Sequence, residues 1–321
     1  MKPIVIAHRG ASAYLPEHTL PCVAAAHALG ADYIEQDIVL SRDGVPMVLH
    51  DIYLDSTTNV AQQFPGRGRD DGRFYAIDFD LTELKTLSVH ERVDADKSPV
   101  FDGRFPVVDL QLRIPTLSEE IMLIEGLNKS RGMSTGYYIE MKAPAFHAAA
   151  GLDIARATID VLEAAGLHRE SAAVFFQCFD PETLRYLKHD LDTPLPLIQL
   201  MGDNSWEEPP GVDFDFMGTE QGLDEVATYA DGIGPWIPQL FKVDGLTPSQ
   251  LVGAAHARGL LVHAYTLRAD SLESGFEDFA ALHKGVFLDA GIDGVFSDFP
   301  DITRGFIDAH FNAQANSSEY C

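Results

Sequence analysis

The sequence has few basic residues and few cysteines, and it lacks a long apolar run. Only 23 lysines and arginines stand against 49 aspartates and glutamates, which gives a formal net charge of −26. A surface of this sign repels polyanions, so we expect no nucleic-acid partner. No stretch approaches the roughly 20 consecutive apolar residues that a membrane-spanning helix needs, so we expect no stable insertion into a membrane.

The three cysteines give little information about function. Cys22, Cys178 and Cys321 are odd in number, lie far apart and match no metal-ligand spacing. Cys22 and Cys178 stand in apolar or strand-like surroundings and are predicted to be buried thiols, whereas Cys321 is predicted to be mobile. These cysteines favour neither an oxidising nor a reducing compartment.

Apolar segments of strand length alternate with helical segments along most of the chain. Its 321 residues, 46% of them hydrophobic, are enough for one (β/α)8 barrel with an insertion. Eight strands are expected, centred on Val5, Ile34, Tyr138, Val174, Leu197, Ile233, Val262 and Val295. This alternation predicts an α/β fold with a parallel sheet, and eight units favour closure into a TIM barrel. An open, doubly wound sheet is the alternative, although no strand is followed by a glycine-rich dinucleotide loop.

The alternation fails between about residues 52 and 113, where arginine, aspartate, glycine and aromatic residues are frequent. A structureless loop of this length is improbable inside a compact domain. We therefore predict a small inserted cap over the barrel mouth, with one helix near residues 81–87. The whole chain, 1–321, is then a single barrel domain with this insertion.

Carboxylates on two of the predicted strands suggest a metal site. Glu35 and Asp37 alternate with apolar residues, so their side chains leave one face about 6.6 Å apart along the strand. Glu140, with Lys142 two residues later, repeats this arrangement on the third barrel strand. Buried like charges need a cation between them, and Ca²⁺ and Mg²⁺ prefer carboxylate oxygens. The alternatives are acids on an exposed strand face and an exposed Glu140–Lys142 pair.

Histidines end two other apolar runs. His8, followed by Arg9, ends the first strand, and His50 ends the strand that returns from the turn at residues 41–44. A lone histidine at a strand end is usually structural, but both runs are expected to be adjacent in the barrel. Two facing histidines suit proton transfer near neutral pH, and Arg9 with Lys142 can bind phosphoryl oxygens. With a divalent cation and three carboxylates, the two basic residues leave a locally positive pocket.

The remaining candidates carry weaker arguments. Phe179, Trp236 and Tyr265 lie near strand ends and are predicted to line the barrel mouth, with packing of the barrel rim as the alternative. Five other histidines are scattered without ligand-like spacing and are predicted to be structural or solvated: His27, His147, His256, His263 and His283.

Together these residues resemble a known family, the glycerophosphodiester phosphodiesterases, and within it the bacterial periplasmic type. The resemblance covers nearly the whole chain, including the segment 64–78. Its motifs are His8-Arg-Gly-Ala-Ser, Pro16-Glu-His-Thr, Glu35-Gln-Asp37, Val48-Leu-His50-Asp51, Glu140-Met-Lys142, Phe176-Gln-Cys-Phe-Asp180, Ala230-Asp-Gly-Ile-Gly-Pro235, Val262-His-Ala-Tyr-Thr-Leu-Arg268 and Gly294-Val-Phe-Ser-Asp-Phe-Pro-Asp301.

The resemblance implies an enzyme that hydrolyses glycerophosphodiesters, such as glycerophosphocholine and glycerophosphoethanolamine, to sn-glycerol 3-phosphate and an alcohol. It implies one metal ion, Ca²⁺ in preference to Mg²⁺, and a cyclic phosphate formed by a glycerol hydroxyl. The residues it assigns are Glu35, Asp37 and Glu140 to the metal, His8 and His50 to acid and base catalysis, Arg9 and Lys142 to phosphate, and Glu17 to the substrate.

Two other functions remain as alternatives. One is a binding protein that kept the barrel and lost turnover, and the other is a barrel phospholipase that acts on intact lipid, which the net charge of −26 disfavours. For location, we expect the periplasm if a leader has been removed and the cytoplasm if the chain is complete as written. Head-group preference and oligomeric state do not follow from the sequence.

Overall fold

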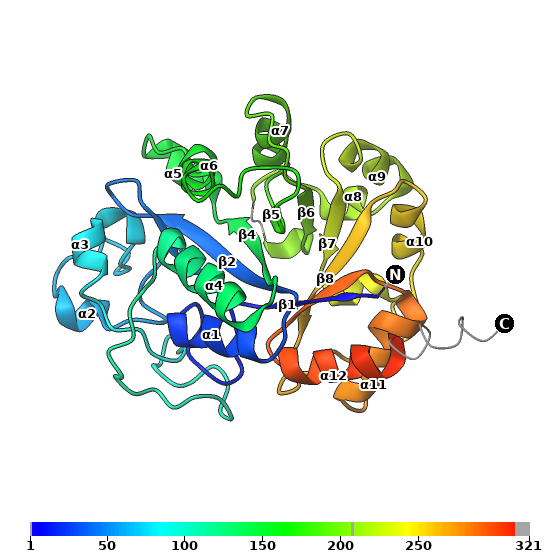
Figure 1. Cartoon of the computed structure of the whole chain (residues 1–321), viewed down its shortest axis with the longest axis horizontal. Helices are drawn as coiled ribbons and strands as arrows, with labels where there is room; N and C mark the ends of the chain where they lie inside the picture. Colours follow the sequence, from blue (N-terminus) through cyan, green and yellow to red (C-terminus); the bar gives the residue numbers. More distant parts are fainter. Residues whose placement is uncertain (1, 207–208, 312–321) are drawn as a thin grey trace.

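The structure is a computed structural model that describes residues 2–206 and 209–311. Within this part of the chain, eight parallel strands form a closed barrel (Figure 1). They are β1 (Ile4–Ala7), β2 (Tyr33–Leu40), β4 (Gly136–Met141), β5 (Val174–Cys178), β6 (Leu197–Met201), β7 (Gly232–Pro235), β8 (Leu261–Leu267) and β9 (Gly294–Ser297). Because β1 pairs with both β9 and β2, the sheet has no free edge between them. The predicted TIM barrel is confirmed, and the open sheet is excluded.

Helices follow the strands and surround the barrel in Figure 1. The outer helices are α1 (Leu20–Ala28), α4 (Leu117–Arg131), α6 (Ile154–Ala164), α7 (Pro181–His189), α9 (Glu220–Val226), α10 (Leu251–His256), α11 (Phe279–Lys284) and α12 (Pro300–Phe311). Thr19 caps α1, since its hydroxyl accepts the Cys22 backbone N–H at 3.4 Å.

Several short elements were not predicted from the sequence. They are α5 (Pro144–Ala149), η2 (Asn204–Trp206), α8 (Phe214–Met217), η3 (Ile237–Leu240), the six-residue helix α11 and the π-type segment η4 (Gly285–Ala290). None exceeds six residues, which is too few to show a helical period clearly.

Side chains fill the barrel below its mouth. Ile6, Tyr138, Ile198 and Phe296 form a buried cluster inside it, and the Tyr138 hydroxyl bonds His263 Nδ1 at 2.8 Å. A larger apolar layer packs the strands against the helices. The barrel interior is therefore a packed core, and in barrels of this kind the active site lies at the carboxyl ends of the strands.

The strand before His50 returns from the turn at residues 41–44 as predicted, but it does not lie next to β1. β3 (Pro46–Val48) is antiparallel to β2 and is not one of the barrel strands. The end of β2 extends past its pairing with β4, and the hairpin returns so that Leu49 N–H bonds Asp37 O at 2.9 Å. His50 is thus delivered to the barrel mouth by a descending strand, and not by a neighbouring barrel strand as expected.

The insert (residues 52–113) contains α2 (Val60–Gln63), the 3-10 turn η1 (Ala76–Asp78) and α3 (Leu81–Leu84). The helix predicted over 81–87 is therefore a single turn, begun by a capping box at Asp80. The insert has its own apolar cluster, which includes Leu54 and Phe79 and packs on the β2–β3 hairpin. Figure 1 shows α2 and α3 at the edge of the molecule beside β2.

Two further expectations concern the cysteines and the membrane. Cys22 and Cys178 are free and buried, as predicted, and Cys321 lies outside the described residues. Among the described residues, no helix is both long and apolar enough to cross a membrane.

Candidate active site

Three carboxylates meet at the carboxyl ends of β2 and β4. One oxygen each of Glu35, Asp37 and Glu140 lies within 4.8 Å of the others, and all three residues are buried. The alternation along β2 points Glu35 and Asp37 to one face, and the register of the parallel pair sets Asp37 beside Glu140. The predicted gathering of these carboxylates is confirmed, and the exposed-face alternative is excluded.

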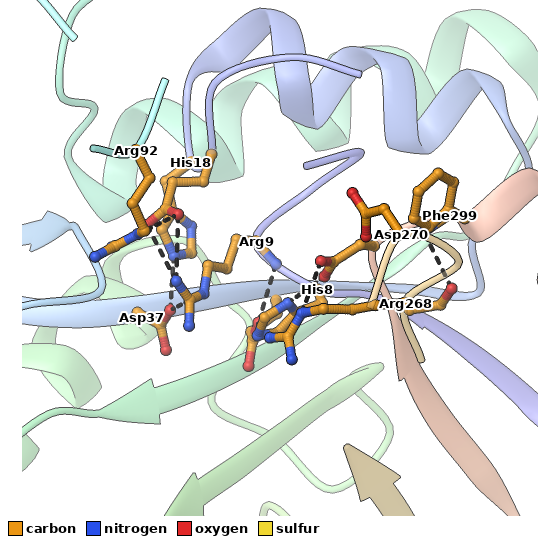
Figure 2. Close-up of polar contacts among 12 residues, drawn as sticks. His8, Arg9, His18, Asp37, Arg92, Arg268, Asp270 and Phe299 are labelled. Carbon is orange, nitrogen blue, oxygen red and sulfur yellow. Dashed lines mark hydrogen bonds and ion pairs between the residues drawn. The ribbon is translucent and has the colours of Figure 1, made fainter. Parts of the chain in front are cut away.

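Neighbouring groups hold part of this cluster. The oxygens of Glu35 accept the Gln177 side-chain amide and the Arg9 backbone N–H, both at 2.9 Å. On Asp37, Oδ2 accepts His18 Nε2 at 2.7 Å, whereas Oδ1 is buried without a hydrogen-bond partner among the described residues. Figure 2 shows His18 above Asp37, with Arg9 beside them.

The charges in this cluster are not balanced by the protein alone. Burial, with repulsion from Asp37 and Glu140, raises the pKa of Glu35 well above its ordinary range. Burial also raises the pKa of Glu140 to about 7, against the opposing Lys142, whose Nζ lies 2.6 Å from Glu140 Oε1. An unpartnered carboxylate oxygen and two carboxyls that resist ionisation fit a site built for a hard divalent cation.

Each predicted catalytic histidine is held by a carboxylate at Nδ1. His8 Nδ1 donates to Asp298 Oδ1 and His50 Nδ1 donates to Asp51 Oδ1, each at 2.5 Å. With Nδ1 protonated, Nε2 is the free base of each ring. The Nε2 atom of His50 accepts from Lys142 Nζ at 3.4 Å.

Burial favours the neutral form of both histidines. Burial, with repulsion from Arg9, lowers the pKa of His8 to about 4 and that of His50 to about 3. A neutral ring with a free Nε2 can accept a proton, and its carboxylate stabilises the cation that forms.

Arg9 occupies a backbone conformation that residues with side chains rarely adopt. Its φ is +58°, and this left-handed turn directs its backbone N–H at Glu35. The next residue, Gly10, also has a positive φ, and a Cβ there would lie 2.8 Å from Cys22 Sγ. The turn after β1 is thus shaped to present Arg9 beside the carboxylate cluster.

The position of Glu17 does not support its predicted contact with substrate. Its oxygens accept from Arg9 Nη1 at 3.2 and 3.3 Å and from Arg92 of the insert at 2.6 and 2.9 Å. It is absent from the lining of the central cavity. Both oxygens of the carboxylate already bind guanidinium groups, so Glu17 holds the Arg9 side chain in position.

A cavity of about 500 Å³ opens over these groups. Its lining includes the predicted catalytic residues His8 and His50, the predicted metal ligands Glu35 and Glu140, and the predicted phosphate ligands Arg9 and Lys142. The predicted aromatic residues Phe179, Trp236 and Tyr265 also line it, whereas Asp37 does not. Trp206, which no motif indicated, adds to the aromatic wall at 5.4 Å from Trp236 between ring centroids. The insert contributes Ile52 and Tyr53.

Sequence reasoning missed several residues that touch the site. His18, Asp51 and Asp298 each lie within a quoted motif, and this membership is the signal that could have identified them as site residues. Gln177 also belongs to a quoted motif, and the sheet places it opposite Glu140 in register. Five histidines predicted to be structural or solvated lie outside the cavity lining: His27, His147, His256, His263 and His283.

Fold and site together define an enzyme of the α/β-barrel class, because titratable groups converge at the carboxyl ends of the barrel strands. The model of the glycerophosphoryl diester phosphodiesterase family matches residues 8–302. The chain belongs to this family, and the resemblance found in its motifs is confirmed.

Similar proteins span almost the full chain. A glycerophosphodiester phosphodiesterase of Haemophilus influenzae is 40% identical, over 95% of this chain and 89% of the relative. One of Treponema pallidum is 34% identical, over 95% and 91%. Among solved structures, an Oleispira antarctica phosphodiesterase in complex with the product sn-glycerol-3-phosphate has a TM-score of 0.64 at 25% identity, covering 95% of this chain and 97% of that one.

Proposed function

We propose that this enzyme hydrolyses glycerophosphodiesters, such as glycerophosphocholine and glycerophosphoethanolamine, to sn-glycerol 3-phosphate and an alcohol. The observation that carries the proposal is one cavity lined by two carboxylate-held histidines and by two members of a cluster of three buried carboxylates. The names of the Haemophilus and Treponema relatives, and the product bound to the Oleispira enzyme, support this choice of substrate.

Glu35, Asp37 and Glu140 would hold one divalent cation, Ca²⁺ in preference to Mg²⁺. Such an ion, when bound, orients oxygen ligands and lowers the pKa of a hydroxyl group, which makes that hydroxyl a better nucleophile. His18 and Gln177 support the carboxylates through hydrogen bonds to Asp37 and Glu35.

The histidines supply proton transfer. One Nε2 takes the proton of a glycerol hydroxyl as its oxygen attacks phosphorus. The other histidine enters this step protonated at Nε2 and gives that proton to the departing alcohol oxygen as its P–O bond breaks. This step yields a cyclic phosphate. Water then opens the ring with the two histidines in exchanged roles, and Arg9 and Lys142 stabilise the charge on the phosphoryl oxygens.

The rest of the cavity suits the alcohol part of the substrate. Phe179, Trp236 and Tyr265 line it beyond Lys142, and we assign them to substrate contacts. The insert, with Ile52 and Tyr53 in the lining, acts as a cap within a single domain of residues 1–321.

The test measures glycerol 3-phosphate and free alcohol released from glycerophosphocholine and glycerophosphoethanolamine. We expect turnover that a chelator abolishes and that added Ca²⁺ or Mg²⁺ restores. His8→Ala and His50→Ala should remove it, and His256→Ala, a change at an exposed histidine on α10, is the matched control. Turnover that persists in excess chelator would contradict the metal assignment, and no release from either substrate would contradict the function.

A further inference from the structure

The carboxylate that holds His50 is itself held by an arginine of the insert. Asp51 uses Oδ1 for His50 and Oδ2 for Arg92, whose Nη1 lies 2.6 Å away. The Nε and Nη2 atoms of Arg92 bind both oxygens of Glu17, which also binds Arg9. Among the described residues, Arg92 is the only arginine or lysine in an ion pair with Asp51.

The carboxylate that holds His8 is bound in the same way from a second point of the insert. Asp298 uses Oδ1 for His8, and its Oδ2 accepts Arg104 Nη2 at 2.6 Å. Arg268 Nε adds a second donor to this oxygen at 3.0 Å. Arg104 is also anchored on Asp270, at 2.7 and 3.0 Å. In Figure 2, Arg92 lies on one side of Arg9, whereas Arg268 and Asp270 lie on the other side, beyond His8.

We propose that the insert positions both catalytic histidines, with Arg92 acting through Asp51 and Arg104 acting through Asp298. The inference rests on the proposed function, because it concerns the two histidines assigned there to proton transfer. It makes the insert part of the catalytic machinery in addition to a cap over the substrate.

Burial is the physical reason why the arginines matter. The side chains of Asp298 and Arg104 are only 1% and 6% exposed. A buried carboxylate without a cation turns toward other donors or takes up a proton, and it then no longer orients the imidazole that it contacts. Burial alone raises the pKa of Asp298, but His8, Arg268 and Arg104 outweigh this effect and hold it well below its ordinary range. The arginines thus keep the carboxylate ionised and in place.

The functional consequence is that each carboxylate selects the tautomer of the histidine that it contacts. A carboxylate at Nδ1 keeps the proton there and leaves Nε2 free toward the cavity. The apolar cluster of the insert packs on the β2–β3 hairpin and includes Val89, three residues before Arg92. Arg104 is placed by its ion pair with Asp270. Two points of the insert therefore set the orientation of the two rings.

The two connections are not equal. Asp298 keeps Arg268 when Arg104 is removed, whereas Asp51 keeps no arginine or lysine partner among the described residues when Arg92 is removed. We therefore expect a larger loss of kcat in Arg92→Ala than in Arg104→Ala. A misplacement of about 1 Å can cost on the order of 100-fold in rate, so we expect a fall of about 10- to 100-fold in kcat with KM changed by less than about 3-fold.

The matched control is Arg69→Ala. Arg69 also lies in the insert and forms the same two-pronged ion pair, with Asp78 at 2.7 and 2.8 Å, but it has no contact with either histidine or its carboxylate. Arg92→Lys and Arg104→Lys keep the charge and should retain more turnover than the alanine variants. Thermal unfolding of every variant separates loss of fold from loss of positioning, and the lysine variants keep the test valid if an alanine variant does not fold.

A second measurement does not depend on turnover. Nitrogen-15 NMR of the histidine rings in the full-length protein should show the Nδ1–H tautomer for His8 and His50, with His50 altered in Arg92→Ala and His8 in Arg104→Ala. Both rings should be unchanged in Arg69→Ala. The inference is overturned if folded Arg92→Ala and Arg104→Ala keep kcat within about 2-fold of the Arg69→Ala control, or if kcat falls while both rings keep their tautomer. A wild-type enzyme without phosphodiesterase activity would contradict the proposed function, and the ring measurement would still decide the positioning.

Discussion

Replacing Glu140 by glutamine is expected to stabilise the metal-free protein above neutral pH, although it removes the partner of Lys142. Burial, opposed by Lys142 but reinforced by repulsion from Asp37, raises the pKa of Glu140 from 4.5 to about 7. One pKa unit corresponds to about 1.4 kcal/mol, so the ionised carboxylate costs the folded state about 3 kcal/mol. Glutamine resembles the protonated acid and avoids this cost.

The direction in which the free energy of unfolding changes with pH follows from proton linkage. Because the folded-state pKa of Glu140 lies above the unfolded-state value, the folded protein binds this proton more tightly. The resulting stability is fully present below pH 4.5, and it is lost as the pH rises to about 7. Glu140→Gln should therefore differ little from wild type at the acidic end of this range and should exceed it by about 3 kcal/mol at pH about 8.

Urea unfolding in chelator, repeated with Ca²⁺, measures both effects. In chelator at pH about 8 the glutamine variant should have the higher free energy of unfolding. With Ca²⁺ at about 100 times its dissociation constant, wild type should gain about 2.7 kcal/mol. The variant should gain less, because it has lost one of three ligands. Glu170→Gln, a change in the exposed loop between α6 and β5, is the control.

Two results would refute this reasoning. A glutamine variant less stable than wild type in chelator at pH about 8 would mean that the ion pair of Glu140 with Lys142 outweighs burial and repulsion. Equal stabilisation of both proteins by Ca²⁺ would mean that Glu140 is not a metal ligand.

Three more substitutions test other parts of the structure. His8→Ala and His50→Ala should each lower kcat at least about 100-fold, while Ca²⁺ still raises the Tm as in wild type; a fall of only a few-fold would contradict the acid–base roles. Tyr138→Phe removes the buried hydroxyl that bonds His263 at 2.8 Å and should lower the free energy of unfolding by about 1–3 kcal/mol, measured in urea. Gly136→Ala would place a Cβ 2.5 Å from a neighbouring backbone oxygen, and this clash should lower the free energy of unfolding by about 1–3 kcal/mol. A Tm equal to that of wild type would contradict this close packing of the strands.

Local patterns were enough to predict most of the scaffold. All eight barrel strands were expected from their apolar segments. The alternation along β2 was enough to put Glu35 and Asp37 on one face. These features depend on the period of a strand, so a short stretch of sequence contains them.

Recognition of the site needed more than these local patterns. His8, His50 and the carboxylates are each unremarkable alone, and the combination of motifs along the chain indicated the family. Glu17 shows the limit of this approach. Its motif suggested a substrate contact, but the structure uses both its oxygens for Arg9 and Arg92. A motif predicts which residues are at a site and not which neighbour each will bind.

The sequence by itself thus determined the strands, the chemistry that they carry and the family. Only the tertiary structure decided that Asp298 holds His8, that β3 pairs with β2 outside the barrel, and that the insert supplies Arg92. These contacts join residues up to 290 positions apart. They depend on the register of each strand pair and on barrel closure, which arise when the whole sheet forms and which no local pattern specifies.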